Sequence, residues 1–317
     1  MFSYRHAFHA GNHADVLKHM VLIAVLRHLR QKDTALTVFD THAGAGLYRL
    51  DGDYAQTSGE AAHGYLRLVS AANEMQAPVN HASTAIKSVA NSDLPGTLAP
   101  MIADYLDLAA GFNGTASYKI YPGSPFIIQR LLGERDKLKL FELHPTDART
   151  LVSNLAQLPV ARQVLVLRED GFEGLKKFLP PPSRRALVLS DPSYELKEDY
   201  TRVSVMLADA LQRFATGCYL VWHPVIPRPQ AHELPRKLKA LAARAGKRWL
   251  HATLSVKSSK LKTDPAGKMV RPGLPASGVF IVNPPHTLDV ALKLALPQLV
   301  RLLGQNQHAA FSLESAK

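Results

Sequence analysis

The chain has almost no cysteine, and Cys218 is the only one among its 317 residues. A single thiol excludes an internal disulfide and any zinc or iron–sulfur site that needs several cysteines. This composition is typical of a protein that works in a reducing compartment. We therefore expect a cytoplasmic location.

Long apolar stretches are also lacking. The longest wholly apolar run is MVLIAVL, residues 20–26, which is far shorter than the roughly 20 residues that a helix needs to cross a bilayer. The N-terminal stretch MFSYRHAFHAGNHAD has no apolar segment typical of a secretory signal. The sequence thus predicts a globular protein without membrane contact.

Acidic residues are scarce in one region. The net charge is +12, and +10 of it comes from residues 236–271, where eleven Lys and Arg residues are accompanied by a single acid, Asp264. A solvated basic surface is one explanation. So local an excess of positive charge favours the other, a surface that binds a polyanion. RNA or DNA is therefore the leading class of partner.

Strands and helices alternate along most of the chain. Residues 14–31 have helical spacing with Asn12 as a candidate N-cap, and residues 35–39 form a candidate buried strand. From residue 119 onward, continuous apolar strands are separated by helices, and HATLSVKS and GVFIVNPP are the last two expected strands. This pattern indicates a mostly parallel sheet covered on both faces.

The segment between these two parts looks different. Residues 50–118 are mostly helical in pattern and show no strong strand. We expect one α/β domain formed by residues 1–49 and 119–317, with residues 50–118 as an inserted helical subdomain. Where the strands resume, Ser124 is the expected N-cap of a helix that has Pro125 at its first position.

A glycine-rich turn follows the first strand in FDTHAGAGLY, residues 39–48. Such a turn lets a ligand approach the backbone closely at the carboxyl end of a strand. A dinucleotide fingerprint would continue with a third glycine where the chain has Arg49. The nicotinamide interpretation is thereby weakened, and a plain tight turn remains an alternative.

Acidic residues recur at the ends of the expected strands, namely Asp40, Glu142, Asp170 and Asp191. A carboxylate at the end of the second strand is suited to accept hydrogen bonds from two ribose hydroxyls. One strand further on, a carboxylate can accept from an adenine amino group. A single acid of this kind is more often a helix cap, but all four at one edge predict a cofactor that contains a nucleoside.

In the stretch LVLSDPSYE, residues 187–195, an apolar strand is followed directly by the short motif Asp-Pro-Ser-Tyr. Methyl transfer to an exocyclic amino group is helped when both amino protons are held by acceptors. Asp191 and the carbonyl of Pro192 match these two acceptors, and Tyr194 matches an aromatic side chain that stacks on a flipped base. An ordinary strand followed by a proline turn is the alternative.

Two other motifs are weighed against structural roles. VNPPH, residues 282–286, resembles the Asp-Pro-Ser-Tyr motif. It follows the last expected strand, however, which we expect to lie away from the centre of the sheet. We therefore interpret it as structural. The N-terminal stretch carries His6, His9, His13 and His19. We expect no metal there, because a second shell of carboxylates is not evident and Lys18 would oppose a cation. Lys18 and His19 are instead expected to meet an anionic group.

Several stretches match one family: SYRHAFHAGNHADVLKH, DTHAGAGLY, YPGSP, ELHP, DGF, DPSYE, FATGCY and ASGVFIVNPP. With them the sequence resembles the bacterial ribosomal large-subunit methyltransferase J family nearly from end to end. The resemblance implies a Rossmann-like class I methyltransferase fold with a helical subdomain inserted after the first strand. It also implies S-adenosylmethionine as cofactor and the N6 atom of one adenine in 23S rRNA as acceptor, adenine 2030 in the family.

The resemblance also implies roles for individual residues. Cofactor contacts are implied for His19, His42, Ser124, Glu142, Asp170, Gly171 and Asp191, with Asp191 also the catalytic residue. Tyr4 is implied to contact the rRNA, with His6 and Lys18 as its neighbours. The protein is expected to act as a monomer without a metal.

One residue departs from the family pattern. Ser193 stands where the family has a second proline. The acceptor carbonyl belongs to Pro192, so the chemistry is retained, but the rigidity of a second proline is lost. DNA adenine or protein amide methylation remains an alternative, as does a basic RNA-binding protein without catalysis.

Overall fold

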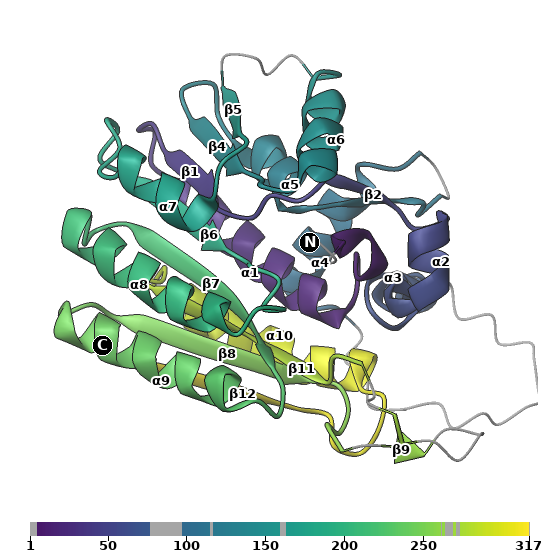
Figure 1. The fold of residues 1–317 in the computed structure, drawn as a ribbon. Coiled ribbons are helices and arrows are strands. Elements are labelled where there is room, and N and C mark those ends of the chain that lie inside the picture. The colour runs from purple at the N-terminus through teal and green to yellow at the C-terminus, as the bar shows by residue number, and fades with distance from the viewer. Residues whose placement is uncertain are drawn as a thin grey trace, which may run out of the picture.

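The computed structural model describes residues 5–76, 97–114, 117–158, 163–260, 262–263, 269–270 and 273–316. Its central sheet has the strand order β12-β8-β11-β7-β6-β1-β4-β5 (Figure 1). In that order the strands are β12 (Ala310–Ala316), β8 (Trp249–Ser255), β11 (Ala276–Val282), β7 (Cys218–Val225), β6 (Ala186–Ser190), β1 (Thr37–Asp40), β4 (Lys137–Phe141) and β5 (Val164–Leu167).

Parallel pairing joins the strands from β5 to β7, and β11 then runs antiparallel between β7 and β8. The chain goes from β1 outward to β4 and β5, and then returns to β6 on the other side of β1. A crevice outside the carboxyl ends of the strands at such a reversal is where open α/β sheets bind ligands. The end of β1 and the end of β6 therefore mark the expected site.

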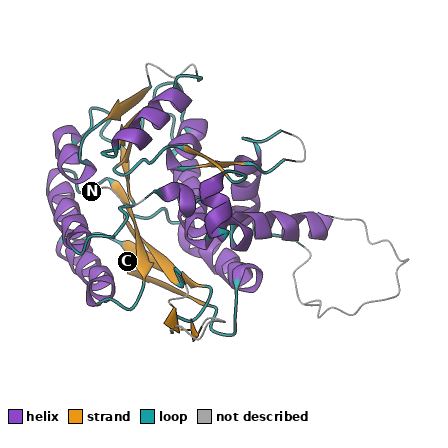
Figure 2. Cartoon of the chain, turned by 45° about the vertical axis from the view of Figure 1, so that its right-hand side comes forward, coloured by secondary structure: helices purple, strands orange, loops and turns teal. Residues whose placement is uncertain are grey.

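Helices cover both faces of the sheet, as the view in Figure 2 shows. One face carries α1 (His13–Leu29), α5 (Ser124–Leu131), α6 (Pro145–Leu155) and α10 (Leu288–Leu303), whose apolar side chains join one core cluster. The other carries α7 (Gly171–Gly174), η3 (Leu175–Phe178), α8 (Glu198–Arg213) and α9 (Pro229–Arg244), which share a second cluster. This three-layer arrangement confirms the predicted α/β fold.

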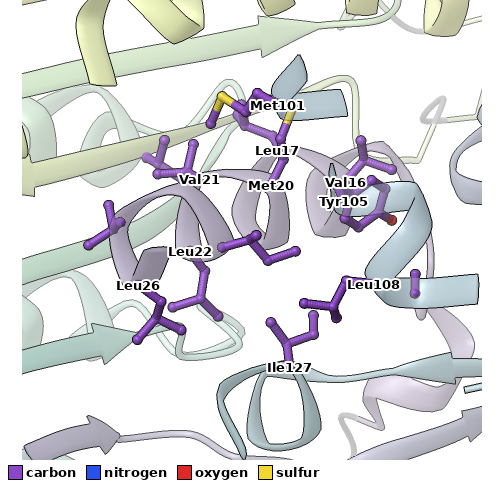
Figure 3. Packing of buried hydrophobic residues seen from close by; sticks show 14 of the residues in the cluster. Val16, Leu17, Met20, Val21, Leu22, Leu26, Met101, Tyr105, Leu108 and Ile127 are labelled. Atoms are coloured by element: carbon purple, nitrogen blue, oxygen red, sulfur yellow. The ribbon is translucent and has the colours of Figure 1, made fainter. Parts of the chain in front are cut away.

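Helix α1 is buried on nearly all of its surface. The Asn12 side chain caps it as predicted, accepting from the backbone N–H groups of Ala14 and Asp15. Figure 3 shows Leu17, Met20 and other apolar side chains of α1 packed against α4 (Pro100–Ala110) and against Ile127 of α5. Burying each such side chain contributes about 1.5–3 kcal/mol, which is enough to hold the polar residues of this helix inside the protein.

The inserted segment shares the core of the α/β domain. Its described elements are α2 (Asp53–Ser58), η2 (Glu60–His63), α3 (Tyr65–Gln76) and α4 (Pro100–Ala110). The two-stranded pair of β2 (Leu47–Arg49) and β3 (Ile120–Pro122) brings the ends of the segment together. Apolar residues of α3 and α4 belong to the same cluster as those of α1. The division into residues 1–49 with 119–317 and residues 50–118 stays a prediction.

Some local predictions are wrong. Ser124 does not cap α5, because the helix begins at Ser124 itself and its hydroxyl donates to Asp40. β11 is not the last strand, since β12 follows it and pairs with β8. The half-exposed, weakly apolar pattern of residues 310–316 gave no strand signal. The remaining elements are η1 (His6–Phe8) and the small pair of β9 (Lys262–Thr263) and β10 (Met269–Val270).

Candidate active site

The acids predicted at strand ends lie on one edge of the sheet, because β1, β4, β5 and β6 are parallel. Glu142, Asp170 and Asp191 line one cavity of about 310 Å³, which we call the cofactor-side cavity. Asp40 is fully buried. It contacts a residue of this cavity, Ser124, whose hydroxyl donates to Asp40 Oδ2 at 2.6 Å.

Glu142 is fixed by the backbone. Its Oε2 accepts from the Gly44 N–H and its Oε1 from the His144 N–H, each at 2.7 Å. Burial raises the pKa of Glu142 to about 7, against the lowering effect of these two donors. Each carboxylate oxygen keeps a further lone pair, which matches the predicted hydrogen bonds from two ribose hydroxyls.

The glycine-rich turn brings its backbone to this carboxylate. Gly44 and Gly46 have φ values of 64° and 82°, a conformation that favours glycine. A side chain at Gly44 would also meet the Tyr48 hydroxyl at 2.3 Å. The turn is therefore tight for steric reasons, and it also lines the cavity at Gly44. The tight turn is thus observed, and contact of its backbone with a cofactor stays a prediction.

Asp170 and Gly171 lie side by side at the start of α7. Asp170 is the N-cap of that helix, with Oδ1 accepting from Phe172 N–H at 3.0 Å, and its Oδ2 accepts from Arg202 at 2.5 Å. Any side chain at Gly171 would lie 2.0 Å from the Thr41 carbonyl oxygen, so only glycine fits. Asp170 is thus both a helix cap and a wall of the cavity.

The two histidines predicted to meet the cofactor also line the cavity. His42 packs edge-on against Phe172, and burial lowers its pKa to about 3, so its ring is neutral. His19 is 1% exposed and its Nδ1 lies 2.9 Å from the Tyr121 hydroxyl. Its buried Nε2 has no hydrogen-bond partner among the described residues. That orphaned atom is suited to a polar group of a bound cofactor.

Asp191 is connected to α1 through a buried charge network. Lys18 Nζ donates to Asp191 Oδ2 and lies 2.8 Å from Asp15 Oδ1. Asp15 Oδ2 lies 3.0 Å from His6 Nε2 and accepts from the Gly11 N–H at 2.9 Å. Two carboxylates therefore share one ammonium group inside the protein.

The network favours the charged forms of Asp15 and Lys18. Burial raises the pKa of Asp191, and the Lys18 charge counteracts that rise. Burial also raises the pKa of Asp15, but His6 and Lys18 outweigh it and hold the pKa well below its usual value. Burial lowers the pKa of Lys18, yet the two carboxylates raise it above its ordinary value. Asp191 thus has a permanent counter-ion beside it.

The residues expected to contact RNA are placed differently from one another. Lys18 meets an anionic group as predicted, but that group is Asp15 and Asp191 of the chain itself, and Lys18 is only 4% exposed. A role in binding an RNA phosphate is therefore not supported, because a buried cation needs its carboxylate partners. His6 lies at the junction of two cavities. Tyr4 lies outside the described residues.

A second cavity of about 270 Å³ lies on the other side of Asp191, and we call it the acceptor-side cavity. Asp191, Ser193, His6, Lys18 and Glu195 line both cavities. The walls that belong to the acceptor side alone come from the N-terminal loop and the start of α1, from the loop after β6, from β7 and from the loops that follow β7 and β8. They are His9, Asn12, Ala14, Asp15, Tyr194, Trp222, Pro224, Ile226, Arg228 and Leu274.

Tyr194 is held by several contacts in this structure. It is 2% exposed, and its hydroxyl donates to the Trp222 carbonyl oxygen at 2.7 Å. The ring packs against Tyr200 and Trp222, with centroid distances of 4.6 and 5.9 Å. Tyr194 also lines the acceptor-side cavity, and its stacking on adenine stays a prediction.

The VNPPH motif lies at the opposite edge of the sheet. Val282 pairs with Tyr219 near the start of β7, whereas Ser190, next to Asp191, pairs with Val221. The Asn283 side chain donates to the carbonyl oxygens of Ala215 and Gly217. This supports the structural interpretation, although the reason is the antiparallel direction of β11 and not a position at the end of the sheet.

The basic segment 236–271 divides into two parts. Helix α9 begins at the active-site edge and runs away from it, so Arg244 and Arg248 lie toward the opposite edge. β8 then returns, and Lys257 and Lys260 follow its end at the active-site edge. Lys268, Arg271 and the side chain of Lys262 lie outside the described part.

In the part of the chain that the structure describes, no three His, Cys, Asp or Glu residues are grouped so that they could hold a metal ion. None of the helices described is long and apolar enough to span a bilayer.

Sequence reasoning missed several residues that the structure brings to the site. Asp15 precedes Lys18 by three residues on a helix, a spacing that could have indicated the ion pair. Arg202 pairs with Asp170 and lies over the Phe172 ring at 4.3 Å. Leu196, 63% exposed, lines the cofactor-side cavity. Local sequence gave no signal for Arg202 or Leu196, because the fold alone places them there.

A Rossmann-like sheet with an antiparallel strand between β7 and β8, and with a cavity beside an Asp-Pro pair at the carboxyl ends of its parallel strands, places the protein among the class I methyltransferases. The chain belongs to the ribosomal RNA large subunit methyltransferase J family. It matches the family model described as "Ribosomal RNA large subunit methyltransferase D, RlmJ" over residues 33–96 and 82–314.

Individual relatives agree with this assignment. The chain is 38% identical over 299 residues to ribosomal RNA large subunit methyltransferase J of Escherichia coli, covering 94% of this chain and 93% of the relative. It is 36% identical to the protein of the same name from Haemophilus influenzae, covering 99% and 98%. The crystal structure of protein LPL1258 from Legionella pneumophila is similar with a TM-score of 0.77 at 29% identity, covering 98% and 99%.

Proposed function

We propose that the protein transfers a methyl group from S-adenosylmethionine to the N6 atom of an adenine in 23S rRNA, with adenine 2030, the family's target, as the expected site. The observation that carries this proposal is the position of Asp191, which lines both cavities. One cavity is suited to the cofactor and the other to a flipped nucleotide. The reacting atoms would then meet at Asp191.

The cofactor-side cavity fits S-adenosylmethionine. Glu142 would accept from its ribose hydroxyls, and Asp170 would lie at its adenine amino group. His42, Ser124 and Gly171 would line its path, and His19 Nε2 would meet a polar group of its amino acid part. When bound, the cofactor supplies an electrophilic methyl group on a sulfonium ion.

The protein's own residues would activate the acceptor. Asp191 and the Pro192 carbonyl would each accept a hydrogen bond from the adenine amino group, which draws its lone pair out of conjugation with the ring. Lys18 holds Asp191 Oδ2, so Oδ1 is the oxygen that would face the amino group and take its proton. Positioning and electrostatics would supply most of the acceleration, without a covalent enzyme intermediate and without a metal.

RNA binding would use both basic and apolar parts of the acceptor side. Trp222 and Ile226 give the cavity apolar walls, and His6 lies at its junction with the cofactor side. Lys257 and Lys260 would meet the RNA backbone near the site, and α9 would extend the contact away from it. Tyr4 is proposed as a further contact from the N-terminal loop. The protein would act as a monomer in the cytoplasm.

The test uses labelled S-adenosylmethionine and 23S rRNA that lacks the modification. We expect one methyl group per rRNA on adenine N6, and a loss of about 100-fold or more in rate for Asp191→Ala. Mapping of the modified nucleotide identifies the site. Transfer to DNA or to a protein amide, binding of RNA without cofactor binding, or full activity of Asp191→Ala would each contradict the proposal.

A further inference from the structure

One wall of the acceptor-side cavity carries the guanidinium of Arg228. This residue lines the acceptor-side cavity and not the cofactor-side cavity. It follows β7, which pairs in parallel with β6, and Asp191 follows β6 at the same edge of the sheet. Because neighbouring strands lie about 4.8 Å apart, the loop that carries Arg228 borders the loop that carries Asp191.

The local sequence fixes the backbone of Arg228. It stands between Pro227 and Pro229, and a residue that precedes proline is restricted to extended conformations. Its φ of −127° and ψ of 135° agree with this restriction. Its N–H donates to the Ile226 carbonyl oxygen at 2.7 Å. The side chain therefore extends from a rigid point at the start of α9.

The guanidinium is held on one side by the protein. Its Nη1 donates to the Tyr194 carbonyl oxygen at 3.1 Å. Burial raises the pKa of the Tyr200 hydroxyl, and the Arg228 charge counteracts that rise, so the guanidinium also lies close to that hydroxyl. A guanidinium has five N–H donors. These contacts fix its place and leave donors for an acceptor in the cavity.

The other positive groups of this cavity have acidic partners within the protein. The ammonium group of Lys18 lies between two carboxylates, and the rings of His6 and His9 each lie 3.0 Å from a carboxylate oxygen. Glu195, a further acid of the walls, helps to raise the pKa of His9. Among the described residues, Arg228 forms no ion pair with an acidic side chain. Its charge therefore suits an anionic group of the ligand.

A phosphodiester group fits these features. An enzyme that modifies a base within RNA has to take the nucleotide out of its stack and hold it there. Contacts to phosphate fix the position of the backbone, whereas contacts to the base provide specificity. A guanidinium can bind two phosphate oxygens at once through parallel N–H groups, which an ammonium group does not reproduce.

We propose that Arg228 binds the phosphodiester group next to the target adenosine, and that this contact holds the extruded nucleotide in the acceptor-side cavity. The proposal rests on the proposed methyl transfer and deepens it. The base would meet Asp191 and the phosphate would meet Arg228, so the protein would hold one nucleotide at two points. Arg228 touches none of the reacting atoms, and the contact forms and breaks no covalent bond.

The test combines a variant of the protein with a change in the RNA. The probe is an rRNA fragment that contains the mapped target adenine and carries one uncharged methylphosphonate in place of the phosphate on either side of that nucleotide. With unmodified RNA, Arg228→Gln should raise the Kd for the fragment at least about 10-fold, as expected for the loss of a charge-assisted hydrogen bond. One of the two methylphosphonates should weaken binding to the wild type by a similar factor.

The decisive comparison combines both changes. That methylphosphonate should cost Arg228→Gln less than about 2-fold, because the contact is already lost. The slope of log Kd against log salt should fall by about 1 in this variant, and the Kd for S-adenosylmethionine should change less than about 2-fold. Two outcomes would overturn the proposal: losses that multiply at both phosphates, or wild-type affinity of Arg228→Gln for the unmodified RNA. The guanidinium would then only connect the loop after β7 to its neighbours.

Arg236→Gln is the matched control. Arg236 lies about two turns further along α9, is exposed and lines neither cavity. Its loss should weaken RNA binding through the general attraction to phosphates, and that loss should multiply with the loss from each methylphosphonate. Arg228→Lys should recover part of the affinity, because it keeps the charge without the paired donors. Coupling of equal size in Arg236→Gln would show that charge alone produces the effect and would contradict a contact at the site.

The proposed function and the phosphate contact fail in different ways. If the wild-type protein transfers no methyl group to rRNA, the proposed function fails. If it transfers the methyl group and Arg228 shows no coupling to either flanking phosphate, only the phosphate contact is overturned.

Discussion

The two cavities that meet at Asp191 are built from different parts of the fold. The cofactor-side cavity takes its polar groups from residues just beyond parallel strands, such as Glu142 after β4 and Asp170 after β5. Apart from Trp222 and Pro224 of β7 and the start of α1, the acceptor-side cavity takes its walls from loops, among them His9, Arg228 and Leu274. The sheet fixes the first set relative to one another, whereas the second depends on contacts between distant loops. The cofactor-side cavity is thus held by the sheet and suits a cofactor that does not vary. The acceptor-side cavity beside it is formed largely by loops, whose sequence can adapt to one particular RNA.

Lys18→Met should have the largest effect on stability and activity, because Lys18 lines both the cofactor-side and the acceptor-side cavity. It leaves Asp15 and Asp191 buried without their shared cation, which costs about 3–5 kcal/mol of unfolding free energy. Without the lowering effect of Lys18, the raised pKa of Asp191 rises further, so the acid limb of kcat should move to higher pH. Chemical unfolding and a pH–rate profile measure these changes. Lys18→Arg is the control, and an unchanged profile in Lys18→Met would contradict the role of the ion pair.

Glu142→Gln should separate the roles of the two cavities. We expect the affinity for S-adenosylmethionine to fall about 10-fold, because hydrogen bonds to a charged acceptor contribute roughly 1.5–3 kcal/mol, with RNA affinity unchanged. The pKa of Glu142 is about 7 without cofactor, and hydroxyl donors favour its ionised form. Cofactor affinity should therefore weaken as the pH falls below about 7.

Calorimetry at several pH values tests this. The pH dependence should be absent in Glu142→Gln. If the wild-type affinity is constant between pH 6 and 8, Glu142 does not bind the cofactor in its ionised form.

Trp222→Leu probes the other cavity. Trp222 lines the acceptor-side cavity only. Loss of an aromatic wall beside a flipped base typically costs about 1–3 kcal/mol, so the KM for rRNA should increase roughly 5-fold or more while the Kd for cofactor stays the same. A weaker cofactor affinity of equal size would mean that the two cavities are not independent.

Ser193→Pro should have the smallest effect. Within the described part of the chain, the Ser193 hydroxyl makes only a long contact of 3.5 Å with the Glu195 N–H, and restoring the family's proline removes backbone freedom from the unfolded chain. We expect turnover to change less than about 3-fold and stability to rise by about 0.4–1 kcal/mol. Steady-state kinetics and thermal unfolding measure both; a large gain in turnover would show that serine weakens catalysis at this position.

The difference between strand-end residues and loop residues also explains which parts of the site could be predicted from the sequence. Strand-end acids such as Glu142 and Asp191 were identified because a run of apolar residues marks each strand and the parallel topology fixes where its end lies. Arg228 and Leu274 were missed because only the packing of separate loops brings them together. Tyr194 was assigned to stacking from its motif, and only the structure shows the hydrogen bond of its hydroxyl.

Helix α1 is core on nearly every side and also carries Asp15, Lys18 and His19. Each position of this helix has to satisfy two requirements together, close packing against several neighbours and the placement of charges beside the reaction. Few substitutions meet both, so this stretch is expected to diverge more slowly among relatives than the exposed surface of α9.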